Sequence, residues 1–203
     1  MAAIMFVCEG NICRSPLAER VLSKALEGVD QGIAVTSAGT RARVGEPMDE
    51  MTAEIARELG VDPTGHLAHQ VTSQDLREAS LVLTANRDQR SAVVRLHPRA
   101  VKYALTIRQL GRILEEGADR GELPTVDSLP PNERVDALLS FVMRRRGLRY
   151  RLDPSADNVI DPYGQSAEVH QLAVTQMLPA LNLLSTALGG SPVGWPAGRR
   201  AKF

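Results

Sequence analysis

The sequence predicts an α/β fold built on an open, mostly parallel sheet, and three observations lead to it. Short apolar runs typical of buried strands occur at 2–7, 33–36 and 81–84. Segments with helical spacing of apolar residues alternate with these runs, and glycines or prolines mark the boundaries. Because right-handed crossovers bring the carboxyl ends of parallel strands to one edge, we expect a ligand site there.

The first predicted unit is a strand, a tight loop and a helix. The apolar run from Ala2 to Val7 ends in Cys8, and the polar loop Glu9-Gly10-Asn11-Ile12-Cys13 follows. A helix is predicted over 15–28, with apolar residues at Leu17, Val21, Leu22 and Ala25. Pro16 lies in its first turn, where proline is tolerated. Backbone N–H groups and the positive end of the helix dipole therefore point into the loop.

This loop has the residue types needed to hold a tetrahedral anion over a thiol. Cys8 and Arg14 are separated by five residues, which can curl into a ring of amides around one anion. Arg14 can bind two of the anion's oxygens at once, while Ser15 can donate a hydrogen bond to a Cys8 thiolate. Gly10 permits the tight path, and Asn11 tolerates left-handed dihedrals. The predicted chemistry is attack of a thiolate on phosphorus.

The remaining elements are predicted from the spacing of apolar residues and from the glycines and prolines that mark boundaries. Further strands, or approaches to strands, are predicted at 66–72 and 101–103. Helices are predicted over 50–59, 73–79, 87–96, 106–116, 132–146 and 165–188. Thr72 or Ser73 can cap the helix at 73–79, and Pro179 is expected to bend the last helix.

Composition and charge restrict the class of protein. The formal net charge is zero, which gives no reason to expect nucleic acid or a membrane as a partner. No apolar run approaches the roughly 18 residues of a membrane span, and the chain begins directly with a strand rather than a signal peptide. The two cysteines lie five positions apart in one loop, unlike a secreted disulfide framework. We therefore expect a cytoplasmic protein.

Several side chains have a structural and a functional interpretation. His66 and His69 could be imagined as metal ligands, but no third ligand lies nearby, and no metal is expected. Arg144-Arg145-Arg146 are expected to form a solvated helix end, and the alternative is a basic rim near the active site that attracts phosphorylated partners. Residues 189–203 are predicted to be a flexible C-terminal tail in which Trp195 does not dock.

The string Val7-Cys8-Glu9-Gly10-Asn11-Ile12-Cys13-Arg14-Ser15-Pro16 resembles the phosphate loop of the low-molecular-weight protein-tyrosine phosphatases. The segments Ser37-Ala38-Gly39-Thr40 and Gly45-Glu46-Pro47-Met48-Asp49 are similar to that family too, and the resemblance covers 2–116 and 157–188. It implies a four-stranded parallel sheet of order 2-1-3-4 with helices on both faces and the phosphate loop after strand 1. It also implies a bacterial member with one domain over 1–188 and an insertion at about 117–155, before an Asp-Pro loop.

The resemblance further implies residue roles. Cys8 is the expected nucleophile, Arg14 holds the phosphoryl oxygens, and Asp161 is the expected general acid and base. Expected to bind substrate are Glu9, Gly10, Asn11, Ile12, Cys13, Ser15 and Tyr163. Asp153-Pro154 has the same local pattern as Asp161-Pro162, but Tyr163 and the last helix directly follow the latter. No cofactor is expected.

The expected reaction is hydrolysis of a phosphomonoester through a thiophosphate on Cys8, with inorganic phosphate as product. The substrate would be a phosphorylated protein, with phosphotyrosine in first place, or a small phosphomonoester. Arg41-Ala42-Arg43-Val44 stand where the family often has an aromatic residue, so an acidic peptide or another phosphoester is an alternative. The same loop also fits an arsenate reductase using an external thiol or a non-catalytic phosphate-binding module. Cys13 could form a disulfide with Cys8 or be a small packing residue.

Overall fold

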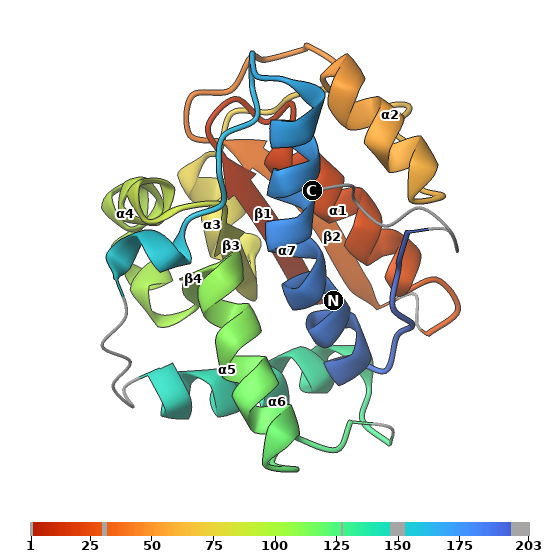
Figure 1. Ribbon diagram of the computed structural model, residues 1–203. Coiled ribbons are helices and arrows are strands. Elements are labelled where there is room, and N and C mark those ends of the chain that lie inside the picture. Colours follow the sequence, from red (N-terminus) through yellow and green to blue (C-terminus); the bar gives the residue numbers. More distant parts are fainter. Residues whose placement is uncertain (1, 30–31, 127, 147–152, 196–203) are drawn as a thin grey trace.

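A four-stranded sheet forms the centre of the computed structural model, which describes residues 2–29, 32–126, 128–146 and 153–195 (Figure 1). The strands are β1 (Ala2–Cys8), β2 (Ile33–Gly39), β3 (Leu81–Thr84) and β4 (Ala104–Thr106). All are parallel, and they lie in the order β2-β1-β3-β4, so the predicted fold class and strand order are confirmed. Cys8 pairs with Gly39 at the end of β1, which places the following loop at the carboxyl edge of the sheet.

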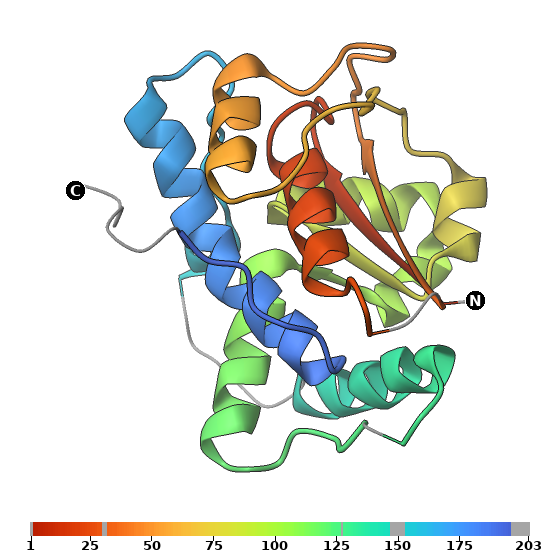
Figure 2. The same cartoon turned by 90° about the vertical axis from the view of Figure 1, so that its right-hand side faces the viewer.

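Helices cover both faces of this sheet (Figures 1 and 2). They are α1 (Arg14–Ala25), α2 (Glu50–Glu58), α3 (Ser73–Glu78), α4 (Arg87–Leu96), α5 (Ile107–Asp119), α6 (Pro131–Arg146) and α7 (Ala167–Ala187), with the 3₁₀ helices η1 (Pro98–Lys102) and η2 (Pro154–Asp157). α7 is one continuous helix that contains Pro179. Thr72 caps α3 with a reciprocal capping box to Asp75, as its position suggested.

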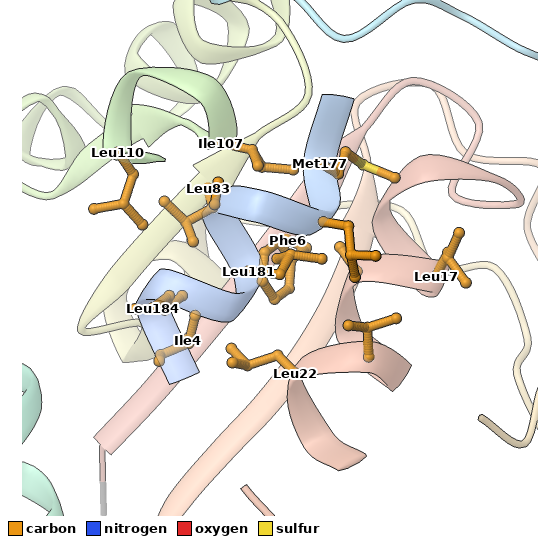
Figure 3. Packing of buried hydrophobic residues seen from close by; sticks show 14 of the residues in the cluster. Ile4, Phe6, Leu17, Leu22, Leu83, Ile107, Leu110, Met177, Leu181 and Leu184 are labelled. Atoms are coloured by element: carbon orange, nitrogen blue, oxygen red, sulfur yellow. The ribbon is translucent and has the colours of Figure 1, made fainter. Parts of the chain in front are cut away.

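Alternate residues of each strand face two separate cores. Ile4 and Phe6 of β1 point to the larger core, where they meet Leu83 and apolar residues of α1, α5 and α7 (Figure 3). Met5 and Val7 point to the smaller core on the other face, which α3 and α4 cover. A Cβ atom added to Gly111 would lie 2.7 Å from the Cβ of Ala180, so glycine allows α5 and α7 to approach this closely.

The stretch expected to be an insertion contributes α6 to the larger core. Buried apolar residues of α6 are Val135, Leu138, Phe141 and Val142. The helix lies across the amino-terminal end of the sheet, opposite the loop at 9–13 (Figures 1 and 2). Arg145 pairs there with Glu116 and Glu122, and Arg146 donates to the carbonyl of Val101. The alternative of a basic rim near the phosphate loop is therefore wrong, and a fully solvated helix end is wrong too, because the Arg145 side chain is only 11 % exposed.

Neither of the two further segments forms a strand: 66–72, predicted as a strand or the approach to one, makes a single bridge, and 101–103 is not the edge strand. Residues 66–72 form no strand beyond a single bridge between Gln70 and Gly39, the last residue of β2. The rest of the segment pairs elsewhere, because the backbone of Ala68 binds Gly45 and Glu46 and the N–H of His69 donates to Asn11. Residues 101–103 do not form the edge strand, because η1 begins at Pro98 and continues to Lys102. The edge strand is β4, whose three residues are all buried.

The described part of the C-terminal segment packs on the body of the protein. The N–H of Val193 donates to the Oδ1 atom of Asn182 at 2.9 Å, and the Nδ2 atom of Asn182 returns a hydrogen bond to the Val193 carbonyl. Trp195 is half-buried against the larger core, so the prediction that it stays undocked is wrong. Residues 196–203 of the predicted tail lie outside the described residues. No described helix has both the length and the apolar character that a membrane crossing requires.

Candidate active site

The loop between β1 and α1 is held by Asn11, which has a φ of 56° and is the only residue other than glycine with a positive φ among those described. Its Nδ2 atom donates to Ser15 Oγ and Ser37 Oγ, both at 2.9 Å. Its Oδ1 atom accepts from the backbone N–H of His69 at 2.7 Å. A fully buried amide with three partners fixes the loop in one conformation.

The thiol of Cys8 lies at the base of this loop and is 2 % exposed. The backbone N–H of Asn11 donates to Cys8 Sγ at 3.3 Å, and Ser15 Oγ lies 2.9 Å from the same sulfur. Ser15 Oγ accepts from Asn11, and its own hydrogen has two acceptors within reach, Cys8 Sγ at 2.9 Å and the Ala38 carbonyl at 3.4 Å. A Cys8 thiolate can only accept, so the nearer contact is then a hydrogen bond from Ser15 to Cys8. Two donors therefore converge on Cys8, an arrangement that stabilises a thiolate.

Arg14 is the first residue of α1, and its side chain is 3 % exposed. One terminal nitrogen lies 2.6 Å from the Oδ2 atom of Asp161, and the other donates to the Val159 carbonyl at 3.3 Å. Its Nε atom is buried and has no hydrogen-bond partner in the described part of the chain. A guanidinium with an unused donor can receive an anion.

A cavity of about 210 Å³ joins these groups to solvent. Its lining residues are Cys8, Glu9, Gly10, Ile12, Cys13, Arg14, Arg41, Arg43, Asp161 and Tyr163. The structure thus brings together eight of the ten residues expected from the sequence, and Asn11 and Ser15 lie directly behind the cavity wall. Asp161 is half-exposed, as a group that exchanges protons with substrate and water requires.

Asp153, the other aspartate in an Asp-Pro pair, lies elsewhere. Its carboxylate accepts from the backbone N–H of Ser155 at 2.8 Å and caps η2, and this bond lowers the pKa of Asp153 below its usual value. It does not line the cavity that holds Cys8. Geometry therefore separates two aspartates that have the same local sequence pattern.

Cys13 is a buried, free thiol, as is Cys8. Burial raises the pKa of Cys13 to about 12, and a hydrogen bond with Thr52 opposes this rise. Thr52 Oγ1 also lies 3.1 Å from Nδ1 of His170, a histidine that is 1 % exposed on α7. Cys13 thus lies in the loop as a neutral thiol, connected to α2 and α7 by polar contacts.

Neither histidine suspected of metal binding has metal-ligand surroundings. Nε2 of His66 lies 2.7 Å from the Asn11 carbonyl oxygen, and His69 pairs with Asp75. Within the described ranges, no group of three or more His, Cys, Asp or Glu side chains could hold a metal ion. Both histidines instead support the loop.

The sequence alone did not assign a loop-supporting role to Ser37, Thr52, His66 or His170. Ser37 donates to Glu19 of α1 at 2.6 Å while it accepts from Asn11. His66, Thr52 and His170 do not line the cavity either. His66 contacts the carbonyl of Asn11, and Thr52 contacts His170. Only Ser37 carried a local signal, the Ser-Ala-Gly-Thr segment, because the others meet the loop through contacts between residues far apart in the chain.

A buried thiol that accepts a hydrogen bond from the N–H of Asn11, with an arginine and an aspartate lining the same cavity, is an arrangement that suits a tetrahedral oxyanion. The family model described as "Low molecular weight phosphotyrosine protein phosphatase" matches residues 3–128. The chain belongs to this family.

Individual relatives agree with this assignment. The low molecular weight protein-tyrosine-phosphatase Etp of Escherichia coli (strain K12) is 38% identical over 96 residues, which are 47% of this chain and 62% of Etp. The low molecular weight protein-tyrosine phosphatase A of Mycobacterium bovis is 38% identical over 111 residues, 53% of this chain and 58% of the relative. The matches span less than two thirds of the length of the curated relatives. Among solved structures, Vibrio vulnificus Wzb in complex with benzylphosphonate superposes with a TM-score of 0.64 and 25% identity, covering 91% of this chain and 97% of Wzb.

Proposed function

We propose that the protein hydrolyses phosphomonoesters of proteins, with phosphotyrosine as the first substrate class. The observation that carries this proposal is the meeting of Cys8, Arg14 and Asp161 in one cavity of about 210 Å³. Family membership supports the same reaction class, and a benzylphosphonate complex of Vibrio vulnificus Wzb supports an aromatic substrate. Small phosphomonoesters remain the alternative substrate class.

The proposed first step forms a phosphorylated cysteine. The Cys8 thiolate attacks phosphorus, and the bond between phosphorus and the leaving oxygen breaks. Asp161 gives its proton to the leaving oxygen. The loop amides and Arg14, including its unused Nε donor, hold the equatorial oxygens as charge develops on them.

The proposed second step releases inorganic phosphate. Asp161, now a carboxylate, takes a proton from water, and the water oxygen attacks phosphorus while the bond to sulfur breaks. Ser15 stabilises Cys8 as a leaving thiolate. Apart from the attacking water, all steps use backbone and side-chain groups of this chain, and we expect no cofactor. A working thiolate and two free cysteines are suited to the reducing cytoplasm, where we expect the protein to act.

Hydrolysis of p-nitrophenyl phosphate between about pH 5 and 8 tests the proposal, in the range where general acids and bases of this kind operate. Cys8→Ser should abolish turnover, and Asp161→Ala should slow it by about 10²-fold to 10⁴-fold. Asp153→Ala is the matched control and should leave the rate unchanged, since that aspartate lies outside the cavity. Activity that survives Cys8→Ser would overturn the mechanism. A wild-type protein that binds phosphate without turnover would favour the binding module, and thiol-dependent turnover of arsenate would favour the reductase.

A further inference from the structure

Positive charge is concentrated on α4, η1 and the first turns of α5. The chain has 24 basic and 24 acidic residues, yet residues 87–112 include seven arginines or lysines and a single acidic residue, Asp88. Four arginines of this stretch gather around residues 156–158, and we call them the arginine cluster: Arg87, Arg90, Arg108 and Arg112. A protein without net charge therefore has a strongly basic surface.

Two arginines of the cluster are paired with a carboxylate. Arg87 lies 3.3 Å from the Oδ2 atom of Asp157, and Arg112 pairs with the Oδ1 atom of the same side chain. Both oxygens of Asp157 are thus in use. The charge of Asp157 offsets one of the four positive charges and leaves the others in excess.

The other two arginines of the cluster bind backbone carbonyls. Arg90 donates to the Ala104 carbonyl at 2.8 Å, and Arg108 donates to the Asn158 carbonyl at 3.0 Å. Within the described part of the chain, neither of them pairs with a carboxylate. Burial and the neighbouring charge of Arg87 lower the pKa of Arg90. Since a guanidinium has five N–H donors, both arginines retain donors and positive charge for another anion.

Helix stability does not account for these positions. Arg87 is the first residue of α4, and Arg108 is the second residue of α5. The first turn of a helix carries a partial positive charge, which favours acidic side chains there and disfavours arginine. α5 has no acidic residue in its first turn. An anion bound at the cluster would be stabilised by the arginines and by the ends of both helices.

The cluster lies on the same edge of the sheet as the phosphate loop. α4 and α5 begin directly after β3 and β4, so their first turns lie at the carboxyl ends of these strands. Arg108 and Arg14 bind the carbonyls of two consecutive residues, Asn158 and Val159. The cluster and the arginine of the phosphate loop are therefore held by one short segment.

The arginines at the mouth of the cavity do not supply such an excess of charge. Arg41 pairs with Glu9 and Arg43 pairs with Glu46, each at 2.6 Å. Each of these positive charges has a glutamate of its own. Uncompensated positive charge on this edge is found in the arginine cluster instead.

On the basis of the proposed function, we propose that the arginine cluster docks an acidic segment of the phosphorylated protein, while the phosphoryl group of that protein lies over Cys8. Carboxylates of the segment would accept charge-assisted hydrogen bonds from the unused donors of Arg90 and Arg108. The position beside the phosphate loop favours this partner over a nucleic acid or a membrane, because one phosphoprotein can occupy both sites and gain from their linkage.

The test compares two phosphotyrosine peptides, one with glutamates on both sides of the phosphotyrosine and one with glutamines at the same positions. The wild type should have the higher kcat/KM for the glutamate peptide. The double variant Arg90→Gln, Arg108→Gln should lower this preference about fivefold, and Arg90→Gln alone should lower it about twofold. A general loss of activity affects both peptides alike and cancels in the preference. The preference of the wild type should also shrink as salt is added, because ions screen exposed charges.

Two further variants separate local charge from other effects. The double variant Arg90→Lys, Arg108→Lys keeps both charges and should keep most of the preference. Arg57→Gln removes an exposed charge from α2 and should leave the preference as in the wild type. Circular dichroism and turnover of p-nitrophenyl phosphate show that each variant keeps the fold.

The outcomes separate this inference from the proposed function. If the wild type hydrolyses both peptides equally well, or if both glutamine variants of the cluster keep the preference, the docking role is wrong and the phosphatase stands. An equal loss of preference in Arg57→Gln would also overturn the inference, since it would point to net charge. Binding of double-stranded DNA or phosphatidylserine vesicles through the cluster, without a peptide preference, would assign it to another polyanion. If the wild type hydrolyses neither peptide nor p-nitrophenyl phosphate, both proposals are wrong.

Discussion

Asn11 combines a backbone role with a side-chain role in the phosphate loop. Its left-handed φ of 56° turns the chain so that its own N–H points at Cys8. Its amide meanwhile binds Ser15, Ser37 and the backbone of His69. Asparagine tolerates this φ better than other residues with a side chain, and glycine could not make the three side-chain bonds. One residue thus couples loop shape to the position of the thiol.

The two cysteines of the loop differ in their surroundings, which predicts different reactivity. In Cys8→Ser, Cys13 is the remaining cysteine of the sequence. Burial raises the pKa of Cys13 from 9.0 to about 12, so at pH 8 the folded protein should react with iodoacetamide about a thousandfold more slowly than the unfolded protein. Because the thiolate fraction rises tenfold per pH unit below that pKa, labelling should accelerate steadily from pH 7 to 9. Equal rates for the folded and unfolded protein, measured by mass spectrometry, would contradict this account.

At the scale of elements, the segment that carries Asp161 is anchored by charges upstream of it. Asp157 is 8 % exposed and pairs with Arg112 of α5 and with Arg87 of α4. Arg108 of α5 donates to the Asn158 carbonyl at 3.0 Å. The N–H of Val159 donates to the Ala85 carbonyl at 2.8 Å, next to the end of β3. These contacts hold the segment so that Asp161 lies next to Arg14 at the carboxyl edge of the sheet.

Removal of this anchor should impair both stability and catalysis. Arg112→Ala leaves Asp157 with one partner, and we expect a loss of about 1–3 kcal/mol in the free energy of unfolding, since a buried carboxylate depends on its pairs. Turnover of p-nitrophenyl phosphate should fall as well, because Asp161 loses its fixed position. Denaturant unfolding and steady-state kinetics measure the two effects.

Arg57→Ala is the control for that prediction. Arg57 pairs with Glu50 in an exposed contact on α2. Exposed ion pairs of this kind contribute about 0–1 kcal/mol to the free energy of unfolding. This variant should match the wild type in both measurements. A similar loss in Arg57→Ala and Arg112→Ala would show that the Asp157 anchor has no special effect.

At the scale of the whole molecule, α6 closes the amino-terminal end of the sheet, and the phosphate loop lies at the other end (Figure 2). Leu138 of α6 is 1 % exposed in the larger core. Leu138→Ala should lower the free energy of unfolding by about 2–5 kcal/mol, the usual cost of a cavity in a core. At temperatures where the variant stays folded, its turnover number should equal that of the wild type. A stability unchanged within about 0.5 kcal/mol would mean that the segment is not part of the folded core.

Local patterns predicted most of the fold and the centre of the site. β1, β2 and β3 begin with short apolar runs, and the residues from Cys8 to Arg14 hold their chemistry within a few positions, so the whole string of residues, rather than the spacing of Cys8 and Arg14 alone, indicates the phosphate loop. The segment 66–72 was misjudged, because its apolar spacing resembles a strand while Asn11, more than 50 residues away, determines its conformation. The position of Arg144-Arg145-Arg146 and the docking of Trp195 depend on tertiary packing that no local pattern encodes.

The central claim is that Cys8 carries the phosphoryl group during turnover, and trapping that intermediate tests it most directly. Asp161→Ala is mixed with p-nitrophenyl phosphate, whose leaving group needs little protonation, and the reaction is quenched within the first turnover. Mass spectrometry should then find one phosphoryl group on the peptide that contains Cys8, because the step that needs Asp161 as a base is slow. Cys8→Ser, treated in the same way with Asp161 intact, should release no p-nitrophenol. A phosphoryl group on another residue, or release of p-nitrophenol by Asp161→Ala with no phosphorylated peptide, would contradict the account.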